Sequence, residues 1–371
     1  MCTVRTLDAM NRTHRRTRVR LLAGLAGALS VTVLAVAGCS SSSSSSSSAA
    51  AASTNSSSAK VPLVVYAAEG YDSAETKAFT KATGIPTKLD DNSTGPLLTQ
   101  IEASKNNPNW GLLWVDGPTA FAALDTQDLL VKGFEPSVSW NALGTASLPT
   151  DKSYVPTGIT LVAAVVYNKA KVKNPPTTFQ ALESATWKGQ VGMDDPSQSG
   201  PTYPFVAGMM NYLGGVSAGE KYFAALKANG LVINPTNGPT LQALTSGRIN
   251  VALVQSSAGV GAALADKNLG IEYLKPATLL PSVIGIDAKA PAAEQQEAEK
   301  FVDFVLSAAG QKVMQSGDPT GDSLYYPVLQ GVNPLPALPP LPSGVTQTIN
   351  PYTWGPQEGT INEWFDANIT R

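Results

Sequence analysis

Val61-Pro62-Leu63-Val64-Val65-Tyr66 is an apolar run that opens a repeating pattern of short strands and helices. The pattern predicts a strand over 61–66, a helix over 73–82, a strand over 87–89, a helix over 92–103 and a strand over 110–115. Thr83-Gly84-Ile85 ends the first helix and starts the next strand. Strands that alternate with helices indicate an α/β fold with parallel strands.

The same alternation continues along the rest of the chain. Strands are predicted over 160–167, 190–193, 231–233, 250–254 and 282–286. Helices are predicted over 178–182, 199–213, 218–228, 257–265, 292–309 and 360–368, with another that ends at Ser246. About 310 residues follow residue 60, which is more than one hydrophobic core usually fills. We therefore expect two lobes.

The N-terminal forty residues have the layout of a secretory signal. Arginines at 12, 15, 16, 18 and 20 precede an apolar, Ala/Gly-rich stretch over 21–37. The sequence Leu34-Ala35-Val36-Ala37-Gly38-Cys39 resembles a bacterial lipobox, which implies a signal peptide over 1–38 and a lipid, palmitate included, on Cys39. Residues 39–60 are almost all Ser and Ala and predict a flexible tether to the cell membrane. A transmembrane anchor over 21–37 is the alternative, and Met10 is an alternative start to Met1.

Missing residue types exclude several kinds of chemistry. The one histidine is His14, and the two cysteines are Cys2 and Cys39, so residues 40–371 contain neither type. Ser-His-Asp catalysis, N/S-ligated zinc and disulfides are thereby excluded there. Gly321-Asp322-Ser323-Leu324 spells the GDSL of an esterase family, but such an enzyme needs a histidine base. We expect no enzyme, no cofactor and no metal.

The charge of the exported part excludes another class of partner. Residues 1–38 hold six of the 26 basic and one of the 28 acidic residues, which leaves a net charge of about −7 for the rest. No basic patch is present, and we expect no nucleic-acid partner.

Four polar loops after predicted strands are the candidate ligand site. They cover 69–72, 92–95, 197–202 and 255–257, and each stands at the start of a predicted helix. Free N–H groups and the helix dipole favour an anion there, although each loop could be a plain helix cap. Ligands of open α/β sheets bind beyond the carboxyl ends of the strands. Acids in the first lobe could instead hold an amine. The predicted site residues are Glu69, Tyr71, Ser93, Thr94, Asp116, Ser197, Ser199, Gly200, Thr202, Tyr203, Ser256, Ser257 and Tyr326.

An ordered set of segments resembles the solute-binding proteins of ABC importers. The segments are Val166-Tyr167-Asn168-Lys169, Pro175-Pro176-Thr177-Thr178-Phe179, Trp187-Lys188-Gly189-Gln190-Val191-Gly192-Met193, Asp195-Pro196-Ser197, Ser246-Gly247-Arg248-Ile249-Asn250 and Tyr326-Pro327-Val328. They resemble the group that includes ferric-iron, thiamine, spermidine/putrescine and 2-aminoethylphosphonate binders.

The resemblance implies a two-lobed, type II periplasmic-binding-protein fold with mixed sheets flanked by helices. Two crossovers, near 154–161 and 273–282, would form the hinge. Lobe I would comprise 61–158 and 281–371, and lobe II 159–280. The resemblance also implies a non-catalytic receptor, expected as a monomer, which delivers a small-molecule solute to an ABC permease and ATPase complex.

The identity of the solute stays open. Serines and threonines in the four loops favour an oxyanion such as a phosphonate or phosphate ester. Ferric iron is an alternative, since Tyr325-Tyr326 is a tyrosine pair, although Gln255-Ser256-Ser257 stands where iron-binding members usually have tyrosines. A polyamine or thiamine is a further alternative. From other classes, the rivals are an extracytoplasmic hydrolase with a carboxylate pair such as Asp194-Asp195, and a structural or sensor lipoprotein.

Overall fold

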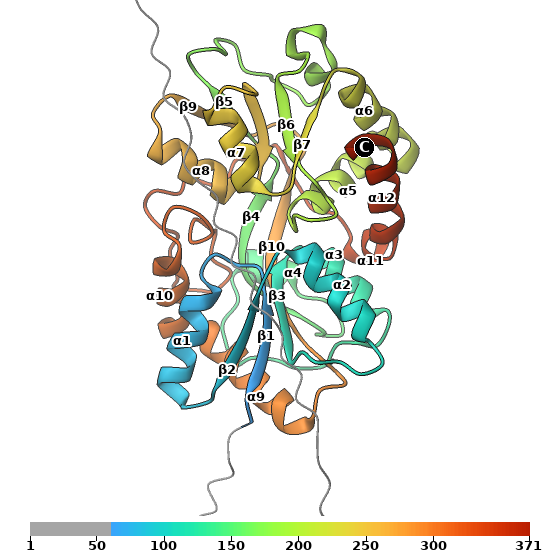
Figure 1. Cartoon of the computed structure of the whole chain (residues 1–371). Coiled ribbons are helices and arrows are strands. Elements are labelled where there is room, and N and C mark those ends of the chain that lie inside the picture. The colour runs from blue at the N-terminus through green and yellow to red at the C-terminus, as the bar shows by residue number, and fades with distance from the viewer. Residues whose placement is uncertain (1–60) are drawn as a thin grey trace, which may run out of the picture. The chain divides into compact units, whose positions relative to one another are not determined.

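The computed structural model describes residues 61–371, which form two α/β lobes, each built on its own sheet (Figure 1). The predicted signal peptide, Cys39 and the tether lie outside the described residues.

Lobe I contains a mixed sheet in the order β11-β10-β3-β1-β2, with β4 on the other side of β10. β1, β2 and β3 are parallel, and β10 runs antiparallel to both β3 and β4. The strands are β1 Leu63–Ala67, β2 Thr87–Asp91, β3 Leu112–Asp116, β4 Val155–Val162, β10 Ala277–Ile286 and β11 Thr346–Gln347. The helices are α1 Asp72–Thr83, α2 Thr94–Ser104, α3 Pro118–Asp125, α4 Ala142–Ser147, α9 Ala292–Val305 and α10 Ala308–Gly317.

Lobe II contains a mixed sheet in the order β7-β6-β8-β5-β9, in which β5 is antiparallel to both neighbours. Its strands are β5 Ala164–Asn168, β6 Val191–Asp194, β7 Val232–Asn234, β8 Val251–Val254 and β9 Leu269–Glu272. Its helices are α5 Thr202–Leu213, α6 Val216–Ala228, α7 Asn237–Thr245 and α8 Ser256–Ala265, with short 3₁₀ helices η1 Gln180–Glu183 and η2 Ala185–Trp187. Two sheets flanked by helices confirm the predicted fold class.

The strands β4 and β10 connect the two lobes, at the places where crossovers were predicted. The strand predicted over 160–167 is in fact two strands. β4 pairs with β10 in the sheet of lobe I, and β5 pairs with β8 and β9 in lobe II. Both pieces are buried, so the apolar run did not reveal that the chain changes sheet. The predicted lobe boundaries at 158–159 and 280–281 fall inside β4 and β10.

The long helix predicted over 292–309 is also divided. α9 ends at Val305, and α10 begins at Ala308 after a turn at Leu306-Ser307. The Ser307 hydroxyl accepts a hydrogen bond from Gly310 N at 3.1 Å and so caps the new helix. By contrast, Gly84 ends α1 as predicted, with a φ of 70°.

The C-terminal segment crosses back to lobe II. It forms α11 Pro351–Trp354, η3 Gly355–Gln357, α12 Glu358–Phe365 and the π-helical turn η4 Asp366–Thr370. Trp354 and Phe365 pack in the hydrophobic cluster of lobe II, whereas the sequence analysis grouped 281–371 with lobe I. Tyr352 in α11 also donates a hydrogen bond to Asp125 of α3, at 2.9 Å, so this segment contacts both lobes.

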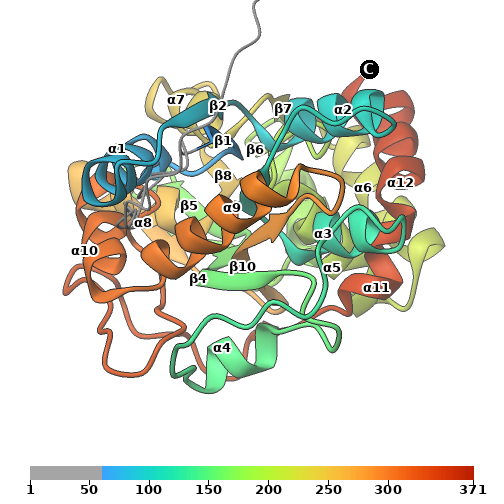
Figure 2. The same cartoon turned by 90° about the horizontal axis from the view of Figure 1, so that it is seen from below.

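An aromatic cluster holds the helices of lobe I against their sheet. Figure 2 shows α9 across the lobe, with α1 and α10 on one flank and α3 on the other. Phe79 of α1 and Trp114 of β3 both contact the ring of Phe301 in α9, with centroids 5.1 and 5.9 Å apart. All three side chains are fully buried, so their packing contributes strongly to the stability of this lobe.

One acid in this core predicts a measurable pH dependence of stability. Glu75 of α1 is fully buried, and neither carboxylate oxygen has a hydrogen-bond partner. Burial raises the pKa of Glu75 to about 9. A raised folded-state pKa means that the contribution of Glu75 to stability is present below pH 4.5 and is lost as the pH rises toward 9. Glu75→Gln is expected to increase the unfolding free energy at pH 8 by about 1–3 kcal/mol.

Urea unfolding at pH 5 and pH 8 measures this effect. The gain from Glu75→Gln should be larger at pH 8 than at pH 5. Glu272→Gln, which alters an exposed acid at the end of β9, serves as the matched control and should change neither value. Equal pH dependence in wild type and Glu75→Gln would contradict the assignment.

Candidate ligand-binding site between the lobes

The four predicted loops meet in two pairs at the interface of the lobes. Loop 92–95 of lobe I touches loop 197–202 of lobe II, where Gly95 N donates a hydrogen bond to Gln198 O at 3.3 Å. Loops 69–72 and 255–257 meet around Asp322, which accepts hydrogen bonds from Gly70 N at 2.8 Å and from the Ser257 hydroxyl at 3.1 Å. The loops converge because each follows a strand whose carboxyl end faces the other lobe.

Three carboxylates gather at the centre of this interface. Glu69 follows β1, Asp116 ends β3, and Asp322 lies in the loop after α10. Glu69 and Asp116 are buried, and none of the three forms an ion pair within residues 61–371. Burial, and then the charge of the neighbouring carboxylates, raises the pKa of Glu69 and of Asp116 well above the ordinary value. The ionised form of these acids is therefore disfavoured where no cation faces them.

Hydrogen bonds from neutral donors hold the carboxylates in place. Ser282 of β10 donates to Glu69 Oε1 at 2.5 Å. Gln255, from lobe II, donates through Nε2 to Asp116 Oδ2 at 2.7 Å and to Thr160 Oγ1 at 3.1 Å. The second oxygen, Asp116 Oδ1, is buried without any partner. The interface thus contains an unused acceptor but no cation to match it.

Most of the predicted hydroxyls already have partners in the protein. Ser256 accepts a hydrogen bond from Leu161 N at 2.9 Å. Ser197 donates to Asp195, directly after β6, and Ser199 donates to Asp194 at the end of β6. Thr94 packs against Gly200 across the interface, Thr202 is buried at the start of α5, and Ser93 precedes α2 without capping it by its side chain. These residues lie at the interface, but four of the seven predicted Ser and Thr hydroxyls, those of Ser197, Ser199, Ser256 and Ser257, already form hydrogen bonds within the protein.

Two predicted residues lie elsewhere, and Tyr71 is mainly a core residue. Tyr203 is buried in lobe II, where its hydroxyl bonds to Trp354 O at 2.5 Å. Tyr326 packs in lobe I and bonds to Pro339 O at 2.9 Å. Both rings point inward because their elements present that face to the core. Tyr71 packs against Trp114 with tilted rings, whose centroids lie 5.3 Å apart, and it lies beside Glu69.

The tyrosine pair considered for iron is committed to other bonds. Tyr325 OH donates to Gln311 Oε1 at 3.1 Å, and Tyr326 OH to Pro339 O. Burial raises the pKa of Tyr326 to about 12. Phenolate formation is therefore unfavourable at Tyr326. Residues 61–371 contain no group of three or more His, Cys, Asp or Glu side chains arranged to hold a metal ion.

Sequence reasoning missed three residues of this interface: Thr160, Ser282 and Asp322. Ser282 was placed only at the start of a strand, and Asp322 was noticed only within the GDSL match. Asp322 reaches Gly70 across 252 positions of sequence, so no local pattern could have paired them. Gln255 was recognised as part of its loop, but not its contact with Asp116.

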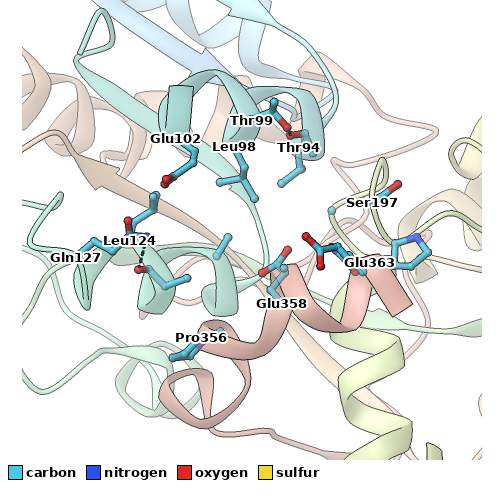
Figure 3. A pocket seen from close by; sticks show the side chains of 18 of the residues that line it. Thr94, Leu98, Thr99, Glu102, Leu124, Gln127, Ser197, Pro356, Glu358 and Glu363 are labelled. Atoms are coloured by element: carbon cyan, nitrogen blue, oxygen red, sulfur yellow. Dashed lines mark hydrogen bonds between the residues drawn. The ribbon is translucent and has the colours of Figure 1, made fainter. Parts of the chain in front are cut away.

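A cavity of about 940 Å³ opens beside the interface (Figure 3). Its walls come from α2 and α3 of lobe I, from loop 196–200 of lobe II and from η3 and α12. Thr94 and Ser197 line it on the side of the interface.

The sequence matches a family of proteins, in keeping with the arrangement of two lobes around a polar interface. Residues 75–339 match the family of bacterial extracellular solute-binding proteins. The chain belongs to this family. The protein is thus a substrate-binding receptor of the ABC-import type and not an enzyme. Membership of this family implies a permease and an ATPase as its partners. The resemblance inferred from the sequence is confirmed.

Individual relatives of the receptor differ in what their names say they bind. A putative 2-aminoethylphosphonate-binding periplasmic protein of Salmonella paratyphi A is 22% identical over 268 residues, which cover 68% of this chain and 76% of that protein. Iron-bound HitA from Pseudomonas aeruginosa superposes with a TM-score of 0.69 at 22% identity, over 82% of this chain and 98% of that one. AfuA from Actinobacillus pleuropneumoniae with fructose-6-phosphate gives a TM-score of 0.73 at 18% identity, over 83% and 98%. These structures establish the type II binding-protein fold.

Within residues 61–371, no helix is both long and apolar enough to cross a membrane.

Proposed function

We propose that the receptor captures a small polar solute that carries both an ammonium group and an anionic group. One observation carries the proposal: Asp116 Oδ1 is a buried acceptor without a partner, and it lies beside two further carboxylates. A buried acceptor of this kind costs free energy until a donor reaches it. An ammonium group supplies three N–H donors and the missing positive charge.

The anionic group would bind at the N-terminus of α8, in one of the four predicted loops. No side chain caps α8, so its first N–H groups keep their capacity to donate. The helix begins at the lobe interface, directly after Gln255, which contacts Asp116. A purely anionic solute would meet three carboxylates there, whereas a zwitterion matches both features. The aminophosphonate named for the Salmonella relative has this charge pattern.

Capture would proceed by closure of the lobes. Gln255 and Ser257 of lobe II already contact Asp116 and Asp322 of lobe I. A solute ammonium would exchange some of these contacts for its own and would be removed from water, with every polar group paired. The hinge would lie where β4 and β10 connect the lobes.

A matched ligand pair tests the proposal by thermal shift. 2-Aminoethylphosphonate should raise the melting temperature of residues 60–371, because a ligand at 1,000 times its Kd stabilises by about 4 kcal/mol. Ethylphosphonate lacks only the ammonium group and should give no shift. Equal shifts by both compounds would refute the role of the carboxylates. A shift with ferric citrate, thiamine or spermidine alone would favour one of the other solute classes.

We also propose that lipid on Cys39 attaches the receptor to the outer face of the cell membrane as a monomer. The lipobox pattern and the Ser/Ala tether over 39–60 support attachment, and one chain supplies all of the interface carboxylates. Cys39→Ala should release the protein from the membrane fraction, and light scattering should give the mass of one chain. Retention of Cys39→Ala in the membrane would support the anchor helix instead.

A further inference from the structure

The cavity beside the interface has an acidic lining that the proposed solute site does not use. Four carboxylates line it, and no Lys, Arg or His does. Glu102 pairs with Lys105, and Asp366 pairs with Arg371 at 2.6 Å. Glu358 and Glu363, both on α12, have no ion-pair partner within residues 61–371. Neither of these two acids therefore has a compensating cation.

Two enclosed acceptors provide a second, independent observation. Glu358 Oε2 and Asn362 Oδ1 are each buried without a hydrogen-bond partner. They stand one helical turn apart on α12, and both residues line the cavity. Figure 3 shows the Glu358 side chain directed into the cavity, opposite Thr94 and Leu98 of α2. Burial, with no cation to offset it, raises the pKa of Glu358 to about 8, so a bound cation would favour the ionised form of this acid.

Part of the remaining wall of the cavity is apolar, which indicates that the ligand also has an apolar part. Leu98, Ala123 and Leu124 provide an apolar surface opposite the acids. A cavity of 940 Å³ is within the range that holds small organic ligands. An aliphatic chain with an ammonium group at its end fits both surfaces, because the N–H donors reach the acceptors and the methylenes cover the apolar wall.

We propose that this cavity is a second site, which binds an aliphatic ammonium compound such as a diamine. Glu358 and Asn362 accept its N–H groups, and Glu363 supplies further negative charge. The site differs from the solute site in its carboxylates, since Glu69, Asp116 and Asp322 do not line it, whereas Thr94 and Ser197 lie at the border between the two sites.

The position of the cavity couples it to the movement of the lobes. Thr94 and Leu98 belong to lobe I, and Ser197 to lobe II, so opening of the receptor would split the wall. A ligand that contacts both sides favours the closed arrangement, and closure favours that ligand by the same factor. This coupling rests on the proposed solute capture, whereas binding in the cavity does not.

Calorimetry on the full chain with putrescine tests the second site. The Asp116→Asn background removes the ammonium contact at the solute site. It is expected to retain one saturable putrescine site per chain, and 1,4-butanediol, the neutral analogue, should not bind. Adding Glu358→Gln and Glu363→Gln should weaken putrescine binding at least about tenfold, equivalent to 1.4 kcal/mol. Glu272→Gln, at an exposed acid of β9 that does not line the cavity, is the control and should leave the affinity unchanged.

A steric variant covers the case in which the double substitution fails to fold. Ala123→Met keeps every charge but fills the cavity from α3, and it should weaken putrescine binding as well. Loss of all putrescine binding in Asp116→Asn alone, or full affinity in both cavity variants, would overturn the second site. Neither result would test the binding of 2-aminoethylphosphonate at the solute site. That binding is measured separately, with the variant that carries both Glu358→Gln and Glu363→Gln.

Discussion

Asp116→Asn is expected to weaken binding of an ammonium-bearing solute by about 100-fold, or 2.7 kcal/mol. The substitution keeps the size of the side chain and an oxygen that can accept from Gln255 Nε2. It removes the negative charge and places an NH₂ donor where the ammonium group would donate. Hydrogen bonds to charged groups contribute about 1.5–3 kcal/mol, which accounts for the expected loss.

The unliganded protein should respond in the opposite direction. In the wild type, the buried Asp116 carboxyl group must either take up a proton or stay charged without a cation, and both cost free energy of folding. The neutral amide of asparagine avoids this cost. The melting temperature of Asp116→Asn without ligand should therefore equal or exceed that of wild type. Asp303→Asn, an exposed aspartate of α9, is the control. Calorimetric titration with 2-aminoethylphosphonate decides the matter, and unchanged affinity in Asp116→Asn would remove Asp116 from the site.

The pH dependence of binding follows from the same group of acids. Burial raises the pKa of Glu69, Asp116 and Asp322 in the unliganded protein. An ammonium group binds the ionised carboxylates, so binding should release protons, and affinity should rise as the pH increases toward the raised pKa values. No basic side chain pairs with any of the three within residues 61–371 to oppose this trend.

Gly95→Ala and Gly261→Ala are expected to prevent full closure of the lobes. A Cβ atom at Gly95 of α2 would overlap the carbonyl oxygen of Ser197 in lobe II. A Cβ atom at Gly261 of α8 would overlap the carbonyl oxygen of Thr320 in lobe I. Backbone atoms cannot move aside as a flexible side chain can, so the lobes must stay apart. Each lobe should still fold, because the overlap arises only across the interface.

The expected result is a larger radius of gyration with solute present and at least tenfold weaker binding, which is about 1.4 kcal/mol. Small-angle scattering and calorimetry measure the two effects. Gly238→Ala is the matched control, since this glycine of α7 has open space where a Cβ would stand. Normal compaction of Gly95→Ala and Gly261→Ala with solute would show that the contacts at these glycines are not required for closure.

Local sequence patterns determined the alternation of strands and helices, the end of α1 at Gly84 and the loops that reach the interface. These features depend on residues near one another in the chain, where periodicity and turn chemistry act directly. The absence of His and Cys after residue 39 likewise needed no structure to exclude several kinds of chemistry.

Only the tertiary structure decided which of those loops meet and what they contain. The run over 160–167 divides between two sheets because β10 and β8 pair with its two halves. Asp322 accepts a hydrogen bond from Gly70 across 252 positions and so lies near Glu69 and Asp116, and it is this group of carboxylates with the unpartnered Asp116 Oδ1 on which the proposed zwitterionic solute rests. Tyr203 and Tyr326 turned inward because the core, not the sequence motif, governs where a ring is buried. Residues close together in the chain determine where helices and strands form. Contacts between residues far apart in the chain determine which of their side chains are buried in the core and which lie at the site.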